Sequence, residues 1–328
     1  MPAPSAQAQT QPAATLLAGS ASRHLAQIVG TQLDTPFASC TVERFPDGEV
    51  SVRLDDAVRG TAVILLAATA PPVNDHLVEL LMMLDTARSA GAQEVNAIIP
   101  YFSFARSDKK DAPRICITAR LVADLIKSAG ATHAMTMMLH SPQVHGFFSI
   151  PTDPLTSRPV FKHYFQQRDL TDTIVVAPDM GHAKSAARFA RELGLPVAAG
   201  NKERLADDRV RITGIVGEQV RGCERALIYD DEIATGGSIL EMSRLLVQRG
   251  VREVWVTCTH GVFSRNAVDR LAEVPEITDI VTTDTVYIPP EKRHPKLHVL
   301  SSAPLFGEAI RANCNRQPIG QLLVFADE

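Results

Sequence analysis

The chain has 328 residues, a formal net charge of −4 at pH 7 and 45% apolar residues. This length is enough for two ordinary domains, and the apolar fraction is enough for a sizeable core. The small net charge does not indicate a nucleic acid or a membrane surface as a partner, and no apolar run is long enough to predict a membrane span. The five cysteines lack the spacing of a metal or redox motif, which is typical of free thiols in a cytoplasmic protein.

Residues 1–14 are mostly Pro, Ala, Gln and Thr, and they lack the basic and apolar regions of a signal peptide. They predict a disordered tail. After the tail, strands and helices alternate along the chain, which is typical of parallel sheets. In the first half we predict strands over Thr15–Ala18, Ala62–Ala67, Val95–Ile99 and Ala134–Leu139, and helices over Ser22–Gln32, Asp75–Ala90 and Ile117–Ser128.

Two segments of the first half carry candidate functional residues. Arg44–Glu49 lies between two predicted strands, and its Asp47-Gly48 pair is a strong hairpin signal, so on these residues alone the segment is a turn. Pro100–Lys110 follows a buried strand and contains aromatic residues and then three cations. Rings suit a nucleotide base, and the Arg106 guanidinium suits phosphate oxygens, although a solvated charged loop fits this segment equally well.

The Pro/Thr/Ser-rich stretch Pro151–Pro159 predicts a boundary between two domains, residues 15–155 and residues 156–328. The last predicted helix is a candidate for packing back on the first domain. In the second half we predict strands over Thr173–Ala177, Ala226–Tyr229 and Glu253–Cys258, and helices over Ala183–Leu193, Ser238–Arg249 and Pro304–Ala312.

The most specific motif covers residues 225–238, where an apolar strand is followed by Asp230-Asp231, a tight polar loop and a helix. The loop Thr235–Ser238 turns backbone N–H groups into a nest for a phosphate dianion, and the helix aims the positive end of its dipole at the same point. The carboxylates lie at the carboxyl end of the strand, where ligands bind in open α/β sheets, and they suit a ribose diol. The motif resembles the ribose-phosphate loop of the phosphoribosyltransferase superfamily.

The two halves of the chain share a sequence pattern. Gly91–Phe104 and Gly250–Phe263 have the same Gly, Glu, Val and Phe at matching positions, and each follows an apolar strand and a helix. This duplication predicts an α/β fold of two tandem domains, each a mainly parallel sheet flanked by helices, and the resemblance of the 225–238 motif implies that both are phosphoribosyltransferase-like. Pro71-Pro72 stands in the first copy where the two aspartates stand in the second, so the first domain has a degenerate ribose-phosphate loop.

Together the motifs closely resemble the ribose-phosphate diphosphokinase family, also called phosphoribosyl pyrophosphate synthetase. The resemblance runs from about Leu16 to Ile310. It implies transfer of the diphosphoryl group of MgATP to the 1-hydroxyl of ribose 5-phosphate, giving AMP and phosphoribosyl pyrophosphate for nucleotide biosynthesis. The matches are Arg44–Glu49, Tyr101–Lys110, Thr118–Asp124, Leu139-His140, Gln143, Gly146–Phe148, Pro178–Gly181, Lys202, Arg204, Asp230–Ser238, Thr259-His260 and Phe263-Ser264.

The resemblance also implies a role for each site residue. The Asp47–Glu49 turn of one subunit reads the adenine bound by its neighbour, which implies a homo-oligomer with a dimeric building block; family members often assemble as hexamers. Lys202 and Arg204 are the catalytic cations on a closing loop, and His140 and Asp179 are associated with Mg²⁺. The implied ATP-binding residues are Phe45, Asp47, Gly48, Glu49, Arg106, Ser107 and Asp108, and those for ribose 5-phosphate are Asp230, Asp231, Ala234, Thr235, Gly236, Gly237 and Ser238. His260 also matches the family, and we interpret it as structural.

Three positions depart from the family pattern. Met138 and Ala234 stand where the pattern has Asp, and Ser107 stands where it has Gln. The loss of two carboxylates predicts weaker metal affinity, or a different metal preference, than in typical members. Three alternatives stay open: a diphosphokinase acting on another ribosyl 1-hydroxyl such as that of ADP-ribose, a phosphoribosyltransferase, and a non-catalytic regulatory homologue.

Overall fold

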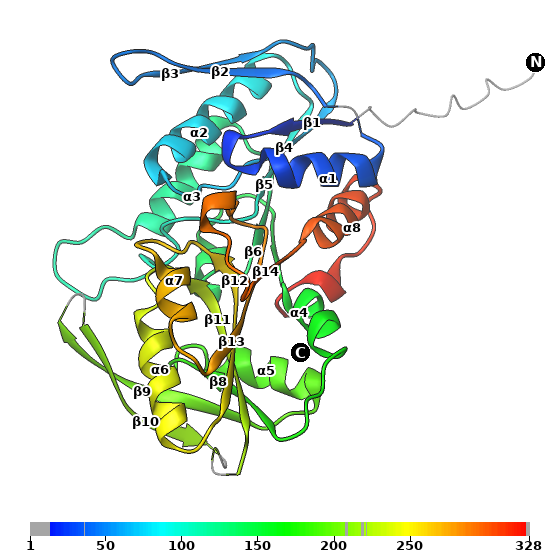
Figure 1. The fold of residues 1–328 in the computed structure, drawn as a ribbon. Coiled ribbons are helices and arrows are strands. Elements are labelled where there is room, and N and C mark those ends of the chain that lie inside the picture. The colour runs from blue at the N-terminus through cyan, green and yellow to red at the C-terminus, as the bar shows by residue number, and fades with distance from the viewer. Residues whose placement is uncertain (1–13, 36, 207–208, 218–219, 221, 326–328) are drawn as a thin grey trace, which may run out of the picture.

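The computed structural model describes residues 14–35, 37–206, 209–217, 220 and 222–325, without the side chains of 202–206 and 209–213. It has two α/β halves, and Figure 1 shows the first half above the second. The tail predicted over residues 1–14 lies outside the described residues except for Ala14, which begins the first strand. No helix in the described ranges is long and apolar enough to cross a membrane.

The first half is built on a sheet with the order β1-β4-β5-β6-β7, in which all neighbouring strands are parallel. The strands β1 and β4 are almost continuously apolar, as is typical of a sheet that helices cover on both faces. On one face Leu80 of α2 and Val122 of α3 pack against the strands, and on the other Leu25 of α1 does so. The elements are β1 (Ala14–Ala18), β4 (Ala62–Leu66), β5 (Glu94–Ile99), β6 (His133–Met137), β7 (Thr152–Leu155), α1 (Arg23–Leu33), α2 (Val73–Ser89) and α3 (Thr118–Ala129).

A separate antiparallel hairpin of β2 (Cys40–Arg44) and β3 (Val50–Leu54) lies at the outer end of the first half (Figure 1). The Asp47-Gly48 pair lies at its tip, and Gly48 has a φ of 96°. This left-handed conformation carries no steric penalty for glycine. The hairpin predicted from this pair is therefore confirmed.

The second half is built on a larger sheet with the order β10-β9-β8-β11-β12-β13-β14, which is parallel except for the β9–β10 pair. Ile239 of α6 and Leu271 of α7 pack on one face, and Phe161 of α4 and Phe189 of α5 pack on the other. The elements are α4 (Arg158–Phe165), β8 (Thr173–Ala177), α5 (Ala183–Leu193), β9 (Val197–Ala206), β10 (Arg209–Gly217), β11 (Arg225–Ile233), α6 (Gly237–Gln248), β12 (Glu253–Gly261), α7 (Ala267–Ala272), β13 (Ile277–Thr283) and β14 (Leu297–Leu300).

The predicted fold class is confirmed, and the backbone repeats the predicted pattern in both halves. β4-α2-β5 in the first half has the same order as β11-α6-β12 in the second, and both strand pairs are parallel. Gly91 and Gly250 follow the two helices with φ of 87° and 98°, and Phe104 and Phe263 both have positive φ, 63° and 43°. The sequence repeat thus corresponds to a repeat of unusual backbone conformations.

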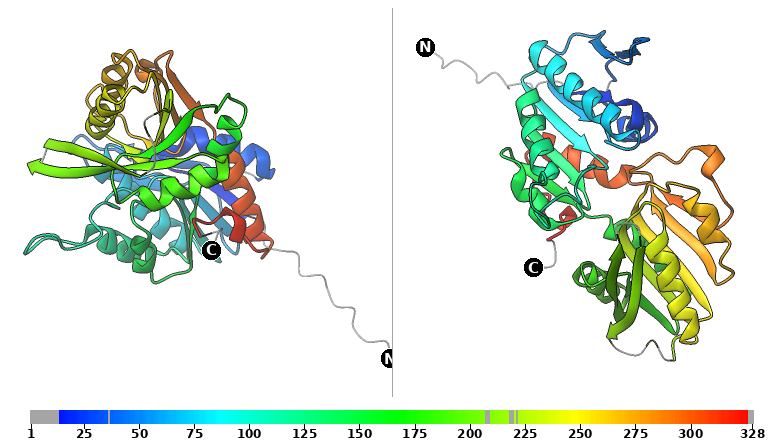
Figure 2. Two further views of the ribbon diagram at one scale, coloured as in Figure 1. Left: turned by 90° about the horizontal axis from the view of Figure 1, so that it is seen from below. Right: turned by 90° about the vertical axis from the view of Figure 1, so that its left-hand side faces the viewer.

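The final helix, α8 (Ala303–Cys314), belongs to the core of the first half although it follows the last strand of the second. Phe306 is fully buried there together with Leu16 and Leu25, and Arg311 donates a hydrogen bond to the carbonyl of Gln32. Figure 2 shows this helix lying beside α1 and closing the side of the first sheet. Short 3₁₀ helices complete the described elements: Ser20–Ser22, Pro142–Phe147, Pro290–Lys292 and Gly320–Leu322.

The stretch Pro151–Pro159 contains more regular structure than its composition indicates. It holds β7, the last strand of the first sheet, and the start of α4, which packs in the second half. Pro159 is compatible with the helix because it lies in the first turn, where its missing N–H would have no partner anyway.

Phe306→Ala tests the return of α8 to the first half. Phe306 is 0% exposed, so its loss leaves a cavity and should lower the free energy of unfolding by about 3–5 kcal/mol. An exposed residue of the same helix, Glu308, provides the control, because Glu308→Ala should change the value by less than about 0.5 kcal/mol. Urea unfolding measures both variants, and an unchanged Phe306→Ala protein would contradict this packing.

Candidate functional site

The candidate site is centred on the carboxyl end of β11, between its parallel neighbours β8 and β12. The strand is buried along almost its whole length, and it carries Asp230 and Asp231 to a depth where they are only 9% and 5% exposed. Carboxylates are seldom buried to this extent without partners, because leaving water disfavours their charge. Their partners therefore determine how the site is arranged.

The loop after β11 is the segment that the sequence predicts to cradle a phosphate. Gly236 has a φ of 75° and is followed directly by the first residue of α6, Gly237. The carbonyl of Ala234 accepts a hydrogen bond from the N–H of Ser264 at 2.8 Å, and the carbonyl of Thr235 accepts one from Arg270 at 3.1 Å. These two bonds hold the loop in place, and the first N–H groups of a helix have no carbonyl partner within the helix, so they can bind an anion.

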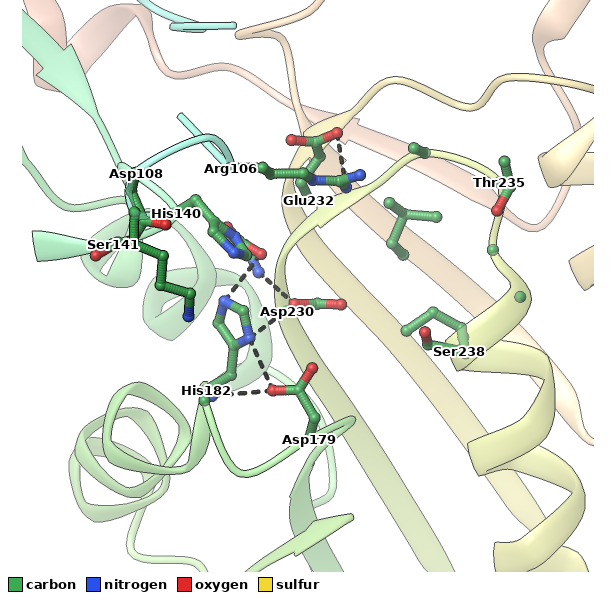
Figure 3. A pocket seen from close by; sticks show the side chains of 18 of the residues that line it. Arg106, Asp108, His140, Ser141, Asp179, His182, Asp230, Glu232, Thr235 and Ser238 are labelled. Atoms are coloured by element: carbon green, nitrogen blue, oxygen red, sulfur yellow. Dashed lines mark hydrogen bonds and ion pairs between the residues drawn. The ribbon is translucent and has the colours of Figure 1, made fainter. Parts of the chain in front are cut away.

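A cavity of about 720 Å³ lies between the two halves at this point. The second half contributes the ends of β8 and β11 and the loop before α6, and the first half contributes the loops after β5 and β6 (Figure 3). The lining includes most of the residues predicted for the site: Arg106, Asp108, His140, Asp179, Asp230, Asp231, Ala234, Thr235, Gly236, Gly237 and Ser238.

Asp231 lies between two imidazoles that come from different halves. His140 Nδ1 lies 2.8 Å from Asp231 Oδ2, and His182 Nε2 lies 3.0 Å from Asp231 Oδ1. The other nitrogen of His182, Nδ1, lies 3.4 Å from Asp179 Oδ1 and 3.6 Å from Asp230 Oδ1. Figure 3 shows His182 pointing into the middle of this group. Both oxygens of Asp231 are thus engaged by imidazoles, whereas the predicted role was binding of a sugar diol.

The charges in this group hold one another in place. Burial opposes the charge of His182, but hydrogen bonds with Asp179 and Asp231 raise the pKa of the imidazole to about 11. Burial and the negative charge of Asp231 raise the pKa of Asp230 well above its ordinary value. Burial also acts to raise the pKa of Asp231, but His140 and His182 outweigh it and lower that pKa well below its ordinary value. Asp231 is therefore the ionised member of the acidic pair.

A second contact joins the halves across the cavity. Arg106 Nη2 lies 2.9 Å from Glu232 Oε1, and the Arg106 side chain is 53% exposed while that of Glu232 is 11% exposed. Burial raises the pKa of Glu232, and the charge of Arg106 acts in the opposite direction. The guanidinium predicted to contact ATP is therefore held at the cavity by a carboxylate of β11.

Sequence analysis missed Glu232 and His182. Glu232 stands next to the acidic pair, and alternation along a strand places it on the opposite face from Asp231, so it had no evident ligand. His182 had one usable signal, because it comes three residues after Asp179 at the start of α5. Asp179 Oδ1 accepts a hydrogen bond from the backbone N–H of His182 at 3.3 Å.

The remaining predicted residues lie away from the cavity or cannot be placed in it. Phe45, Asp47, Gly48 and Glu49 are exposed at the β2–β3 hairpin, and none of them lines the cavity. The hydroxyl of Ser107 donates to the carbonyl of Cys116 at 3.0 Å and accepts from the N–H of Thr118 at 3.2 Å, so it ties its loop to α3. Lys202 and Arg204 lie on β9, paired with Ile212 and Val210 of β10, and their side chains are outside the described part of the chain.

Met138 and His260 are buried where the two halves of the molecule meet. Met138 is 8% exposed, and the hydroxyl of Thr156 contacts its sulfur at 3.5 Å. His260 Nε2 lies 3.1 Å from the carbonyl of Met137 and 3.3 Å from that of Met138, and Nδ1 lies 2.9 Å from the Thr285 hydroxyl. Carbonyls only accept, so Nε2 carries the proton, and His260 joins the halves as a neutral ring, in agreement with its interpretation as structural.

A parallel α/β sheet with a glycine-rich anion cradle beside a buried acidic pair defines a sugar-phosphate-binding protein of the phosphoribosyltransferase type. Comparison with known proteins makes the class specific. The family described as the N-terminal domain of ribose phosphate pyrophosphokinase matches residues 14–130, and the phosphoribosyl synthetase-associated domain matches residues 208–324.

Full-length relatives agree with these two matches. The chain is 42% identical over 296 residues to the ribose-phosphate pyrophosphokinase of Caldanaerobacter subterraneus, covering 90% of this chain and 93% of that protein. It is 42% identical over 309 residues to that of Rhodopirellula baltica, covering 94% and 97%. The crystal structure of phosphoribosylpyrophosphate synthetase from Mycobacterium smegmatis superposes with a TM-score of 0.86 at 37% identity, covering 92% and 99%. The chain therefore belongs to the ribose-phosphate pyrophosphokinase family.

The buried ring of His260 makes stability depend on pH. Burial lowers its pKa from 6.5 to about 4, so between these values the unfolded chain binds more protons and stability rises with pH. Between pH 7 and pH 5 this group should account for a loss on the order of 1–2 kcal/mol in the free energy of unfolding.

His260→Gln should remove that part of the pH dependence, so its unfolding free energy should fall less between pH 7 and pH 5 than that of the wild type. The exposed His163 gives the control, because His163→Gln should keep the wild-type dependence. Urea unfolding at the two pH values measures all three proteins, and an equal fall in His260→Gln would show that the ring is not held neutral.

Proposed function

We propose that this protein transfers the diphosphoryl group of MgATP to the 1-hydroxyl of ribose 5-phosphate, forming phosphoribosyl pyrophosphate and AMP. The observation that carries this proposal is the juxtaposition of the anion cradle at the start of α6 with Asp230 and Asp231 on β11. A phosphate and a pentose bound there would have the Arg106 side of the first half directly across the cavity.

The cradle would hold the 5-phosphate of the acceptor. The loop Thr235–Ser238 offers backbone N–H groups and the N-terminal end of a 12-residue helix, both of which favour a phosphate dianion. Ala234 does not weaken this proposal, because a cradle of this kind uses main-chain amides. The sugar hydroxyls would lie toward Asp230, whose carboxylate is less fully bonded than that of Asp231.

The nucleotide would lie on the side of the first half. An ion pair with Glu232 keeps Arg106 at the cavity, and its side chain is 53% exposed, so a ligand can reach it. A guanidinium binds phosphate oxygens in fork geometry. The hairpin residues Phe45 and Asp47–Glu49 lie away from this cavity, so they would serve the site of a second copy. The proposed assembly is accordingly a homo-oligomer, with a dimer as its building block.

The chemical step requires positioning and cations more than covalent help from the protein. Holding the 1-hydroxyl in line with the β-phosphorus of ATP contributes up to roughly 7–11 kcal/mol to barrier lowering. Lys202 and Arg204 are two residues apart on β9, and they are the cations that we propose to act on the migrating group. Cations so placed would stabilise the negative charge that develops on the migrating group.

Magnesium would enter as the counter-ion of the nucleotide, so MgATP is the proposed substrate. Asp179 lines the cavity and offers the carboxylate oxygen that such a hard cation prefers. His140, the other predicted magnesium residue, lies beside a second imidazole and presents a nitrogen-rich set of donors, which fits Mg²⁺ poorly. The poor fit between His140 and Mg²⁺ concerns a cation bound by protein side chains, not the magnesium that accompanies ATP.

The proposed reaction is tested by incubating the protein with ATP, Mg²⁺ and ribose 5-phosphate. We expect AMP to form in proportion to the ribose 5-phosphate consumed, together with phosphoribosyl pyrophosphate, and no AMP without the sugar phosphate. AMP formed only with another ribosyl acceptor such as ADP-ribose would contradict the choice of acceptor. Absence of turnover with every acceptor would contradict the proposed activity.

Lys202→Ala should lower kcat by about 10²–10³-fold, because a cation that acts on developing charge contributes roughly 3–4 kcal/mol to the transition state. Affinity for ribose 5-phosphate should stay close to that of the wild type, since the interaction forms mainly as the diphosphoryl group moves. Lys127→Ala, at an exposed position of α3, is the matched control with unchanged kinetics. A loss of sugar affinity as large as the loss of kcat would contradict the role of Lys202.

A further inference from the structure

The group around Asp231 contains more nitrogen donors than binding of a sugar or a nucleotide requires. One donor atom each from His140, His182 and Asp231 lie within 4.8 Å of one another, and no other such group occurs in the part of the chain that the structure describes. All three residues line the cavity. The histidines come from different halves of the molecule, so the group closes the floor of the cavity from both sides (Figure 3).

The spacing of these atoms suits a small dication. Tetrahedral Zn²⁺ with bonds of about 2.0–2.1 Å holds its ligand atoms about 3.3 Å apart. The two imidazole–carboxylate distances are 2.8 and 3.0 Å. These two distances run to different oxygens of Asp231, and one donor atom of each residue lies within 4.8 Å of the other two. Side-chain rotations that move these atoms by on the order of 1 Å would bring three donors to the tetrahedral spacing.

The ring of His182 has the surroundings that metal-binding histidines typically have. Its Nε2 faces Asp231, and its Nδ1 faces Asp179 Oδ1 at 3.4 Å and Asp230 Oδ1 at 3.6 Å. A carboxylate behind the second ring nitrogen fixes the tautomer and increases the basicity of the ligating nitrogen. The backbone N–H of His182 bonds the same Asp179 oxygen at 3.3 Å, which fixes the direction of the side chain.

The kind of donor decides the kind of cation. Mg²⁺ prefers oxygen ligands and keeps most of its waters, whereas imidazole nitrogens favour Zn²⁺, Co²⁺ and related ions. We propose that His140, His182 and Asp231 form a binding site for a transition-metal dication such as Zn²⁺ or Co²⁺, with its remaining coordination positions open to the cavity. The positive charge would also offset the negative charge of Asp231.

This inference rests on the proposed function for the location of the site, because the cation would lie on the floor of the sugar pocket. The sequence predicts a different metal preference because Met138 and Ala234 stand in place of two carboxylates, and a preference for Zn²⁺ or Co²⁺ over Mg²⁺ would be that difference. The sulfur of Met138 accepts a hydrogen bond from the Thr156 hydroxyl at 3.5 Å, so this position offers no carboxylate to a cation, whereas His182 supplies a nitrogen 3.0 Å from Asp231 Oδ1.

Metal binding without substrates tests the inference. The full chain is freed of metal with a chelator, dialysed, and titrated with Co²⁺ by visible absorption and with Zn²⁺ and Mg²⁺ by calorimetry. We expect one Co²⁺ per chain with the absorption bands of a nitrogen-ligated ion, and Zn²⁺ affinity more than about 100-fold higher than Mg²⁺ affinity. Zn²⁺ and Mg²⁺ of equal affinity would overturn the proposal.

Variants assign the site to its residues. His182→Gln and His140→Gln should each lower Zn²⁺ affinity by more than about 100-fold, and Asp179→Asn, behind the His182 ring, by about 10–100-fold. His298→Gln is the matched control, because His298 forms a single imidazole–carboxylate pair with Asp279 at 2.9 Å, and its affinity should equal that of the wild type. Circular dichroism tests whether each variant is folded. His140→Gln is the variant that should disturb the core least, because the His140 side chain is 34% exposed.

The outcomes separate this inference from the proposed function. Tight Zn²⁺ binding lost in His140→Gln and His182→Gln, whatever the AMP assay shows, supports the metal site. Zn²⁺ binding that both variants retain, in a protein that forms AMP from ATP and ribose 5-phosphate, overturns the metal site and leaves the diphosphokinase in place.

Discussion

The site depends on one electrostatic constraint: Asp231 is ionised and 5% exposed at the end of a central strand. A buried carboxylate must be paired, because its uncompensated charge would cost several kcal/mol or more. The two partners that pair with it, His140 and His182, come from different halves of the chain. Pairing this charge therefore also positions the halves across a cavity. The same arrangement forms the floor of the proposed sugar site and the proposed metal site.

Other contacts also hold the two halves together. Arg106 reaches Glu232, His260 reaches the carbonyls of Met137 and Met138, and α8 returns to pack on the first sheet. Ligand sites of parallel sheets lie in the crevice outside the carboxyl ends of the strands. In this protein loops of the first half line the other side of that crevice, so in the proposed reaction an acceptor held by one half would face a donor held by the other.

The fold could be predicted from the sequence to a large extent. The predicted strand Thr173–Ala177 and helix Ala183–Leu193 match the structure at both ends, because the spacing of their apolar residues and the polar residues that flank them are clear signals. The sequence did not reveal α4, β13 and β14. For α4, the proline at position 159 indicated a domain boundary and not a helix. For β13, the strand ends in buried threonines, whose hydroxyls bond to one another and to the Thr259 carbonyl. Their burial depends on tertiary packing and has no local signal.

The candidate site could be predicted in part. The cradle and the acidic pair form one continuous motif, and the structure brings them to one cavity with Arg106, His140 and Asp179. The partners of those acids could not be predicted, because His140 and Asp231 are 91 residues apart and only folding brings them together. For the same reason the resemblance suggested Mg²⁺ at His140, whereas the structure shows a second imidazole beside it.

The most direct test of the central claim is a crystal structure with ribose 5-phosphate bound. The expected result places the phosphate on the amides between Thr235 and Ser238, with the ring hydroxyls toward Asp230 and the 1-hydroxyl facing Arg106 across the cavity. A sugar phosphate bound elsewhere, or a loop at Thr235–Ser238 left without ligand at saturating concentration, would contradict the claim that this cavity holds the acceptor.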